Sequence, residues 1–378
     1  MKNSDIKKDL NAIIKWAGGK ENELKFILPN APEKISNYYE PFVGGGSVFV
    51  SINANKYFIN DKSEELTSLY KSISTNDKNF YNWLTLIALS WKTMKNFVNI
   101  KSTIVKKYKE FRSNIIATND FETFIKSSIS NYKHKFTDII DRQFIWERNI
   151  LLQELEKNLL SKTRRMSKIE TQKGLLDDKD LYDNIETAFM SALYMYYRHL
   201  YNNSSDYQDK ALSTALFVFI RNYAYSGMFR YNTNGLFNVP YGGIAYNNKF
   251  LDKKISYYKS PQLTSLLSKT MIYCLDFEDF LRKTKPKKND FIFLDPPYDT
   301  EFSTYAKNKF DKNDQKRLAN YLCNNCKSKW MMIIKNTPFI QSLYCNKNLT
   351  ITRFDKTYTV SFMNRNNKNA EHLLIKNY

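Results

Sequence analysis

The chain has 378 residues, of which 42% are hydrophobic, so it can bury the core of one large domain or of two ordinary ones, and its composition excludes wholesale disorder. It contains neither an apolar run of about 18 residues nor the apolar segment of a secretory signal, which argues against a membrane protein and leads us to expect a cytoplasmic one. The formal net charge of +20 favours a polyanionic partner such as nucleic acid, although a composition rich in Lys and Asn also arises from AT-rich coding sequence.

The first predicted strand runs into a glycine cluster, in the stretch YYEPFVGGGSVFV that begins at Tyr38. We expect a strand, a tight turn at Gly44, Gly45 and Gly46, and a helix that opens after Ser47. The spacing differs from the GxGxxG pattern of dinucleotide sites, and no GKS or GKT follows, which excludes a P-loop. The turn therefore lets the backbone approach a ligand closely without offering a phosphate signature.

A second predicted strand, KYFIND, ends in Asp61. An acid at the end of the second strand is the position that holds ribose hydroxyls in Rossmann-like sheets. The glycine turn and Asp61 together fit a nucleoside that lacks phosphates, such as S-adenosylmethionine. For this segment alone, a glycine-rich turn followed by a surface Asp is the alternative.

The middle of the chain, residues 71–265, is rich in Lys and mostly helical by its periodicity. Apolar residues recur at three- and four-residue spacing in ERNILLQELEKNLLSK, from Glu147, and in LYDNIETAFMSALYMYYRHL, from Leu181. Short apolar runs return after residue 265, as TMIYCL, DFIFL, WMMIIK, LTITRF and EHLLIKNY. We therefore predict an α/β fold in which residues 1–70 and 266–378 assemble one Rossmann-like sheet and residues 71–265 form an inserted, mainly helical domain.

The run FIFLDPPY places an acid directly after a predicted strand. Four consecutive apolar residues, from Phe291 to Leu294, indicate a strand that is covered on both faces. Pro296 and Pro297 must end it, because proline cannot donate a hydrogen bond to a sheet. Asp295 is then delivered at the carboxyl end of a strand, where open α/β sheets bind ligands.

Cys323 and Cys326 have the spacing of metal ligands, in the sequence CNNC. No second such pair and no nearby His completes a set of four ligands. We expect the end of a helix at this position and no metal site.

Five motifs in chain order resemble one family. They are KWAGGK (Lys15 to Lys20), EPFVGGGSVF, IND, RYNTNGLFNVPYG (Arg230 to Gly242) and LDPPY, and together they resemble the bacterial and phage DNA adenine-N6 methyltransferases of the GATC-modifying (Dam-like) type. The similarity spans both ends of the chain and residues 217–243, about half of its length, and says little about residues 75–210. It implies a methyltransferase fold, S-adenosylmethionine as cofactor and double-stranded DNA as partner, with a cognate restriction endonuclease as a further partner to consider.

The resemblance implies a cofactor site built from both glycine clusters and several strand ends. Lys20 would lie near the methionine carboxylate and Asp61 would hold the ribose. Asp276 and Phe277, in CLDFEDF, match the position that meets the adenine of the cofactor, with a structural Phe–Asp turn as the alternative. The set implied for cofactor binding is Trp16, Ala17, Gly18, Lys20, Glu40, Pro41, Phe42, Gly44, Gly45, Gly46, Ser47, Asp61, Asp276, Phe277 and Asp295.

The catalytic residues that the resemblance implies are Asp295, Pro296, Pro297 and Tyr298. The exocyclic amine of adenine is a poor nucleophile because its lone pair is delocalised into the ring. Asp295 would accept one N6–H and the Pro296 carbonyl the other, which favours the developing positive nitrogen. Tyr298 would stack on an adenine flipped out of the duplex, and the methyl transfer would be direct and metal-free.

The DNA contacts implied by the resemblance lie mainly in the RYNTNGLFNVPYG segment. Arg230 has the chemistry for a bidentate contact to guanine or for a phosphate contact. Tyr225 matches an aromatic that intrudes beside the target, whereas Ser226 stands where members carry Asn. We expect a target that contains GA, with GATC as first guess. The set implied is Lys15, Tyr225, Ser226, Arg230, Asn232, Asn238, Pro240, Arg365 and Lys368.

Four other functions remain open from the residues alone. Cytosine-N4 enzymes more often carry Ser, and glutamine-modifying enzymes Asn, in place of Asp295, and both would lack RYNTNGLFNVP. A catalytically silent DNA-binding regulator would keep the fold, but the intact DPPY argues against it. RNA as the substrate of an adenine methyltransferase is compatible with the charge.

Overall fold

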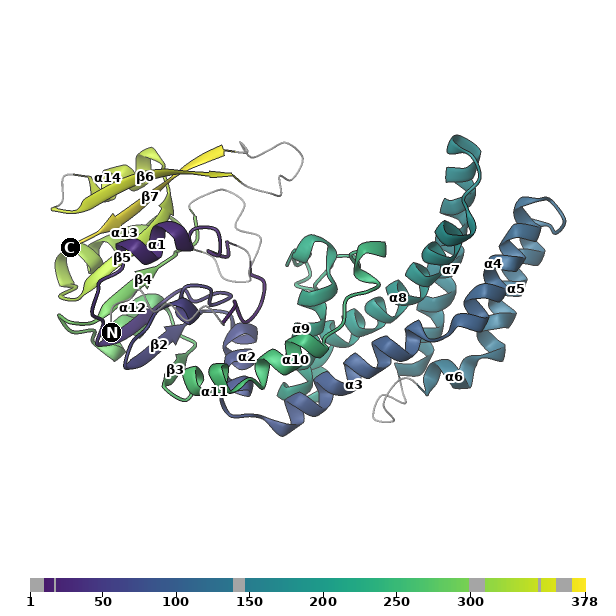
Figure 1. Ribbon diagram of the computed structural model, residues 1–378, viewed down its shortest axis with the longest axis horizontal. Coiled ribbons are helices and arrows are strands. Elements are labelled where there is room, and N and C mark those ends of the chain that lie inside the picture. The colour runs from purple at the N-terminus through teal and green to yellow at the C-terminus, as the bar shows by residue number, and fades with distance from the viewer. Residues whose placement is uncertain (1–9, 17, 139–146, 299–309, 346–347, 358–368) are drawn as a thin grey trace. The chain divides into compact units, whose positions relative to one another are not determined.

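The computed structural model describes residues 10–16, 18–138, 147–298, 310–345, 348–357 and 369–378. The chain forms two compact units (Figure 1). The first comprises residues 1–75 and 258–378 and contains the sheet, and the second comprises residues 76–257 and is mainly helical.

Within the described residues, the first unit contains one sheet of seven strands in the order β3-β2-β1-β4-β5-β7-β6. Strands β1 to β5 pair in parallel, whereas β7 lies antiparallel between β5 and β6. This arrangement confirms the predicted α/β class with a Rossmann-like sheet. The strands are β1 (Asn37–Glu40), β2 (Lys56–Asn60), β3 (Thr270–Tyr273), β4 (Phe291–Leu294), β5 (Lys329–Lys335), β6 (Thr350–Thr357) and β7 (Asn369–Lys376).

The strand order reverses between β1 and β4. From β1 the sheet continues through β2 to β3 on one side, and from β4 to β5 on the other. Because β1 and β4 are parallel, Glu40 at the end of β1 and Leu294 at the end of β4 lie at the same edge of the sheet. Ligands of open α/β sheets bind outside such a switch point. The fold therefore delivers Glu40 and Asp295 to an edge suited to ligand binding.

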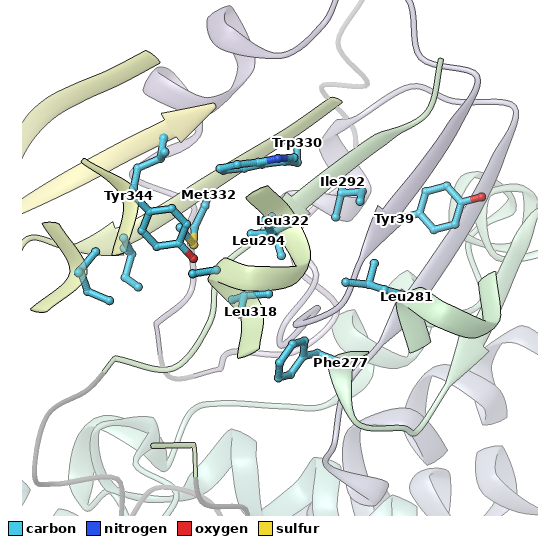
Figure 2. Packing of buried hydrophobic residues seen from close by; sticks show 14 of the residues in the cluster. Tyr39, Phe277, Leu281, Ile292, Leu294, Leu318, Leu322, Trp330, Met332 and Tyr344 are labelled. Atoms are coloured by element: carbon cyan, nitrogen blue, oxygen red, sulfur yellow. The ribbon is translucent and has the colours of Figure 1, made fainter. Parts of the chain in front are cut away.

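One face of the sheet is covered by α12 (Phe277–Thr284), α13 (Lys312–Asn320) and α14 (Pro338–Tyr344). Figure 2 shows the side chains of this core, with Leu318 and Leu322 lying toward the strand residues. All four residues of β4 are buried, as expected of a central strand between two layers. The labelled members of the cluster are Tyr39, Phe277, Leu281, Ile292, Leu294, Leu318, Leu322, Trp330, Met332 and Tyr344.

Aromatic rings pack on the other face of β1 and β2. The ring of Tyr57 lies edge-on to those of Tyr38 and Phe49, and Phe49 contacts Tyr70 of α2 (Glu64–Ser74) in the same way. Helix α2 begins directly after the second strand, and the Ser63 hydroxyl caps it by accepting from the Leu66 N–H. Helices α1 (Leu24–Asn30) and α11 (Pro261–Leu267) complete this unit within the described residues.

The helix that the sequence predicts after Ser47 is a single 3-10 turn, η1 (Phe49–Ser51). A helix is therefore present at the predicted position, but it is only one turn long. Residues 48–50 and 52 are all buried, and Ile52 already has extended backbone, so the chain turns away toward β2 after one turn. The expectation of a helix end at Cys323 is confirmed, since the π-helical turn η6 (Tyr321–Asn325) continues α13.

In the second unit, α8 packs against α3, α4, α7 and α9 (Figure 1). Its core is aromatic: the Trp91 ring centre lies 4.1 Å from that of Tyr223, and Phe219 contacts both Tyr194 and Tyr197. The two stretches predicted as helices are α7 and α8. The helices are α3 (Lys78–Lys95), α4 (Val98–Arg112), α5 (Thr118–Asn131), α6 (Lys133–Thr137), α7 (Arg148–Lys173), α8 (Asp178–Asn202), α9 (Lys210–Tyr223) and α10 (Asp252–Tyr258).

Within the described residues, no helix combines the length and the apolar content that a membrane crossing requires.

Candidate functional site

Asp295 directly follows β4, and its side chain is 20% exposed. It forms an ion pair with Lys20, whose side chain is 3% exposed. The Lys20 ammonium also donates to the Gly18 carbonyl at 2.6 Å and lies 5.8 Å from the centre of the Tyr298 ring. The Lys20 backbone N–H donates to the Ser47 hydroxyl at 3.1 Å. Three motifs that are far apart in the sequence therefore meet around one buried cation.

Glu40 provides a second carboxyl group at this edge of the sheet. It is 2% exposed and accepts a hydrogen bond from the Tyr38 hydroxyl at 2.7 Å. Burial raises the pKa of Glu40 well above its usual value, the nearby Asp295 raises it further, and the Tyr38 hydroxyl and the Lys20 cation oppose the rise. The switch point thus combines one solvent-accessible carboxylate, Asp295, with one enclosed carboxyl group, Glu40, and both interact with the charge of Lys20.

Asp61 binds the glycine turn. Its carboxylate accepts from the Gly44 N–H at 3.0 Å and from the Ser63 N–H at 2.9 Å. Burial raises the pKa of Asp61 to about 6, even though both N–H groups favour the charged form. The carboxylate is therefore fixed at the end of β2 with its acceptor capacity only partly used.

The glycines of the turn have no room for side chains. A Cβ on Gly45 would lie 2.3 Å from the Ile14 carbonyl oxygen, and one on Gly46 would lie 2.4 Å from the Tyr70 hydroxyl. The Ile13 N–H donates to the Gly45 carbonyl at 2.9 Å, so the N-terminal segment is docked on the turn. At Gly44 a Cβ would lie 3.0 Å from the Trp16 ring. The two glycine clusters of the sequence are therefore neighbours in space.

Asn60, which sequence reasoning did not single out, connects the two strand ends beside this turn. Its side-chain amide donates to the carbonyls of Pro41 and Leu275, both at 3.0 Å, and its side-chain oxygen accepts from the Leu275 N–H at 2.9 Å. It is 1% exposed. A polar residue at an otherwise apolar strand end was the available signal, because a buried amide requires partners.

Phe277 and Phe42 form an aromatic pair whose ring centres lie 5.6 Å apart. Phe277 is buried and opens α12, and Asp276 caps that helix by accepting from the Glu278 N–H at 3.0 Å. Arg317 of α13 pairs with Asp276 at 2.6 Å, and its guanidinium lies 4.9 Å from the centre of the Phe277 ring. Asp276 thus has a structural role as a helix cap, and sequence reasoning missed Arg317.

The DPPY segment is held from α13. The Gln315 side-chain amide donates to the Pro297 carbonyl at 2.8 Å. Tyr298 is partly buried, and its ring contacts that of His372 of β7, with centres 5.5 Å apart. Pro296 is buried whereas Pro297 is exposed. The motif therefore follows β4 at the carboxyl edge of the sheet, and the peptide after Pro297 is held by the hydrogen bond from Gln315.

In the second unit, residues 228–241 form a hairpin-like loop with an exposed arginine. The Arg230 side chain donates to the Asn238 side-chain oxygen at 3.1 Å. The Asn232 side-chain oxygen accepts from the N–H groups of Asn234 and Leu236, which closes the turn at the tip. A bridge between Tyr231 and Phe237 joins the two arms. The arms of the loop are short, and the turn at its tip is closed by the two hydrogen bonds to Asn232.

Tyr225 and Ser226 lie at the base of this loop. The Tyr225 N–H donates to the Pro240 carbonyl at 2.9 Å, and the Tyr225 side chain is 50% exposed. Ser226 has a φ of +52°, a conformation that Asn adopts more readily than Ser. Arg221 supports this turn, since it donates to the Gly227 carbonyl at 2.8 Å.

Helix α8 anchors the loop through side-chain bonds to its backbone. The Asn202 amide donates to the Phe237 carbonyl at 3.1 Å, and its oxygen accepts from the Phe237 N–H at 2.8 Å. Tyr194 and Arg198 both donate to the Val239 carbonyl, at 2.9 Å and 3.2 Å. These bonds fix the loop while leaving Arg230 at the surface.

The predicted site residues thus fall into two groups. Lys20, Gly18, Ser47, Asp295 and Tyr298 meet at the switch point, next to the turn that carries Asp61. The loop residues, from Tyr225 to Pro240, belong to the second unit. Ala17, Arg365 and Lys368 lie outside the described residues.

Among the described residues, no group of three or more His, Cys, Asp or Glu side chains could hold a metal ion. Cys326 lies 3.2 Å from the Ser328 hydroxyl, and Cys323 is half-buried at the end of α13.

A family model described as D12 class N6 adenine-specific DNA methyltransferase matches residues 16–137 and 165–360 of this chain. The match includes all five motifs, apart from the first residue of the first one, and it omits residues 138–164, which contain the first part of α7.

Similar proteins cover nearly the full length of the chain. The type II methyltransferase M.CviBI of Paramecium bursaria Chlorella virus NC1A is 25% identical over 98% of this chain and all of its own length. The Retron Ec67 DNA adenine methylase of Escherichia coli is 29% identical over 89% of this chain and 81% of its own length. The DNA adenine methylase of Vibrio cholerae is 23% identical over 95% of this chain and 94% of its own length.

Proposed function

Because the chain belongs to the D12 class of N6 adenine-specific DNA methyltransferases, we propose that it flips an adenine out of duplex DNA and transfers the methyl group of S-adenosylmethionine directly to N6. Membership of the class makes the chain a DNA adenine-N6 methyltransferase, and the proposal concerns how it acts and on which site. The observation that carries it is the position of Asp295 at the carboxyl end of β4, beside the point where the strand order reverses.

Asp295 and the Pro296 carbonyl are the acceptors that the reaction needs. The adenine amine becomes a nucleophile only when its lone pair is withdrawn from the ring, and two acceptors on its two N–H bonds favour that geometry. Proline fixes its own φ, so the direction of the Pro296 carbonyl is restricted. Tyr298 offers a flat ring against which the base can stack, a contact worth about 1–3 kcal/mol.

The residues around the glycine turn fit S-adenosylmethionine, which supplies the methyl group when bound. The turn brings backbone without side chains to the switch point, and the fixed carboxylate of Asp61 has free acceptor capacity for ribose hydroxyls. The half-buried Phe42 ring, which packs on the buried Phe277, offers aromatic surface for an adenine. We assign the methionine carboxylate to Lys20, which is also paired to Asp295.

We further propose that the loop around Arg230 reads the target. Arg230 is exposed and bonded to Asn238, which orients the guanidinium for a bidentate contact to guanine. Tyr225 is exposed at the base of the loop, where it can fill the space that a flipped base leaves. These features favour a target that contains GA, with GATC as the first candidate.

Substitution of Asp295 tests the mechanism. We expect Asp295→Ala and Asp295→Asn to lower methyl incorporation into duplex DNA at least about 100-fold, as for other groups that act on developing charge. S-Adenosylmethionine binding, measured by calorimetry, should be largely retained. Asp279→Ala removes an exposed acid on α12 and serves as the control that keeps full activity.

Full activity in both Asp295 variants would show that this residue has another role. The methylated product should be identified by mass spectrometry as N6-methyladenine, and single-molecule sequencing of DNA from cells that express the protein should show the modified base within GA. Methylation of cytosine, or of RNA in preference to duplex DNA, would contradict the proposal.

A further inference from the structure

The backbone of the DPPY segment cannot fix itself by donating hydrogen bonds. Pro296 and Pro297 have no N–H group, so between Asp295 and Tyr298 this stretch offers the rest of the protein only carbonyl acceptors. Backbone hydrogen bonds that hold the two prolines must therefore come from donors elsewhere in the protein. Whichever donor reaches these carbonyls therefore helps to determine where the Asp295 carboxylate and the Pro296 carbonyl lie.

Gln315 supplies such a donor from a rigid element. Its side-chain amide donates to the Pro297 carbonyl at 2.8 Å, and the residue is fully buried. It follows the capping box of α13, in which Asp311 accepts from the Asp314 N–H and Asp314 accepts from the Asp311 N–H. The next turn of the helix is anchored in the core by Leu318. The backbone that carries the donor is therefore held in place by the helix.

The chemistry of the contact fixes the orientation of the amide. A carbonyl only accepts, so the NH₂ group of Gln315 must face Pro297. The side-chain oxygen of Gln315 is then buried and has no hydrogen-bond partner in the described part of the chain. Burying an acceptor in this way is unfavourable, whereas a leucine would fill a similar volume without that loss. A glutamine that is poorly suited to the core but bonded to the motif points to a role beyond packing.

We propose that Gln315 is a positioning residue for methyl transfer, which holds the Pro297 carbonyl and thereby fixes the two acceptors of the adenine amine. This inference rests on the function proposed above for Asp295 and Pro296. The peptide that follows Pro297 is held at its oxygen, and the rigid φ of both prolines transmits that constraint back toward Asp295. Misplacement of reacting groups by about 1 Å can lower a rate about 100-fold, so this bond acts on kcat rather than on cofactor binding.

Two substitutions separate positioning from packing. Gln315→Leu keeps the volume and removes the donor, and we expect kcat to fall about 10- to 100-fold with the KM for S-adenosylmethionine within about twofold of the unchanged protein. Gln315→Glu places a carboxyl group in the same buried position. When neutral, that group can donate to the Pro297 carbonyl, so the kcat of this variant should rise as the pH is lowered, relative to the unchanged protein at the same pH.

Ile340→Ala, on α14 in the same core cluster, is the matched control for packing. It should lower the melting temperature because it leaves a cavity, but keep kcat within about twofold at temperatures well below unfolding. An unchanged kcat in Gln315→Leu would overturn the inference. The inference would also fail if Gln315→Leu and Ile340→Ala lost kcat in the same proportion to their loss of melting temperature. The proposed function fails separately, if the Asp295 variants stay active.

Discussion

At the scale of single residues, the site depends on bonds between distant parts of the sequence. The sequence predicted Asp295 at a strand end and Asp61 at the end of the second strand, because an apolar run followed by an acid is a local pattern. It did not predict that Lys20 pairs with Asp295, 275 positions away, or that Gln315 holds Pro297. Such contacts leave no pattern in the neighbouring sequence, because they form only when the sheet and its helices pack together.

Because we propose that Asp61 holds the ribose of the cofactor, we expect cofactor binding to depend on pH. Its pKa of about 6 lies above that of a free Asp because of burial, so it is ionised above pH 7 and protonated below pH 5. A carboxylate accepts from both ribose hydroxyls, whereas the protonated acid loses one acceptor site. We expect the affinity for S-adenosylmethionine, measured by calorimetry, to be constant from pH 8 to pH 7 and to fall about tenfold from pH 7 to pH 5.

Asp61→Asn is the matched control for this pH dependence. It should bind S-adenosylmethionine more weakly at pH 8 and show little change in affinity down to pH 5. If the variant loses affinity between pH 7 and pH 5 as steeply as the unchanged protein, another group is responsible for the effect.

At the scale of elements, the glycine turn shows what a sequence pattern leaves undetermined. The sequence predicted a strand, a turn and a helix, and the first two are present, with Gly44 and Gly46 at positive φ. The helix is only one turn long, because its residues are enclosed and the chain continues into β2. The sequence explained the three glycines by the close approach of a ligand, and it did not predict their close contacts within the protein. Two of them make room for the Ile14 carbonyl and the Tyr70 hydroxyl.

Gly45→Ala tests this element. The added methyl group would lie 2.3 Å from the Ile14 carbonyl oxygen, which is backbone and cannot swing aside. We expect the free energy of unfolding to fall by about 1–3 kcal/mol, as in other overpacked sites, and S-adenosylmethionine binding to weaken as the N-terminal segment is displaced. Denaturant titration and calorimetry measure the two effects.

Gly19→Ala is the control, since its closest neighbour is the end of the flexible Glu21 side chain at 2.6 Å. Both glycines lie outside the left-handed region, so backbone strain does not distinguish them. Equal stability losses in the two variants would show that close packing at Gly45 is not what the turn requires.

At the scale of the whole molecule, the sheet could be predicted from the sequence and the position of its last strand could not. Buried runs such as Phe291–Leu294 identified the parallel strands, and the resemblance of the five motifs identified the family, which the family match confirms. The insertion of β7 between β5 and β6 is a non-local pairing that periodicity does not encode. The long middle region was predicted as helical, but its packing around α8 depends on aromatic contacts spread over residues 91–223.

The net charge of +20 is a property of the whole molecule, and we expect basic residues of α7 to contact DNA phosphates. Its exposed Arg165 and Lys168 lie at or just beyond the end of the stretch that the family model omits. Each phosphate contact releases counterions, so the affinity for duplex DNA should fall steeply with salt, by about 10³ or more from 50 to 200 mM if six or more phosphates are neutralised. Neutralising Arg165 and Lys168 to Gln together should lower affinity for all sequences and reduce the salt slope by about 2.

Lys34 and Lys56 provide the matched control for this charge effect. Both are exposed, and they lie before or at the amino ends of β1 and β2, the edge of the sheet opposite to Asp295. Replacing both by Gln removes the same charge, but it should leave the salt slope unchanged. The slope is set by the number of phosphates that the protein neutralises by direct contact, whereas the net charge acts only at long range and is screened by salt. Fluorescence anisotropy with one duplex over a salt series measures all three proteins. A flat salt dependence in the unchanged protein would mean that its charge does not drive binding, and equal slopes in both double variants would remove α7 from the interface.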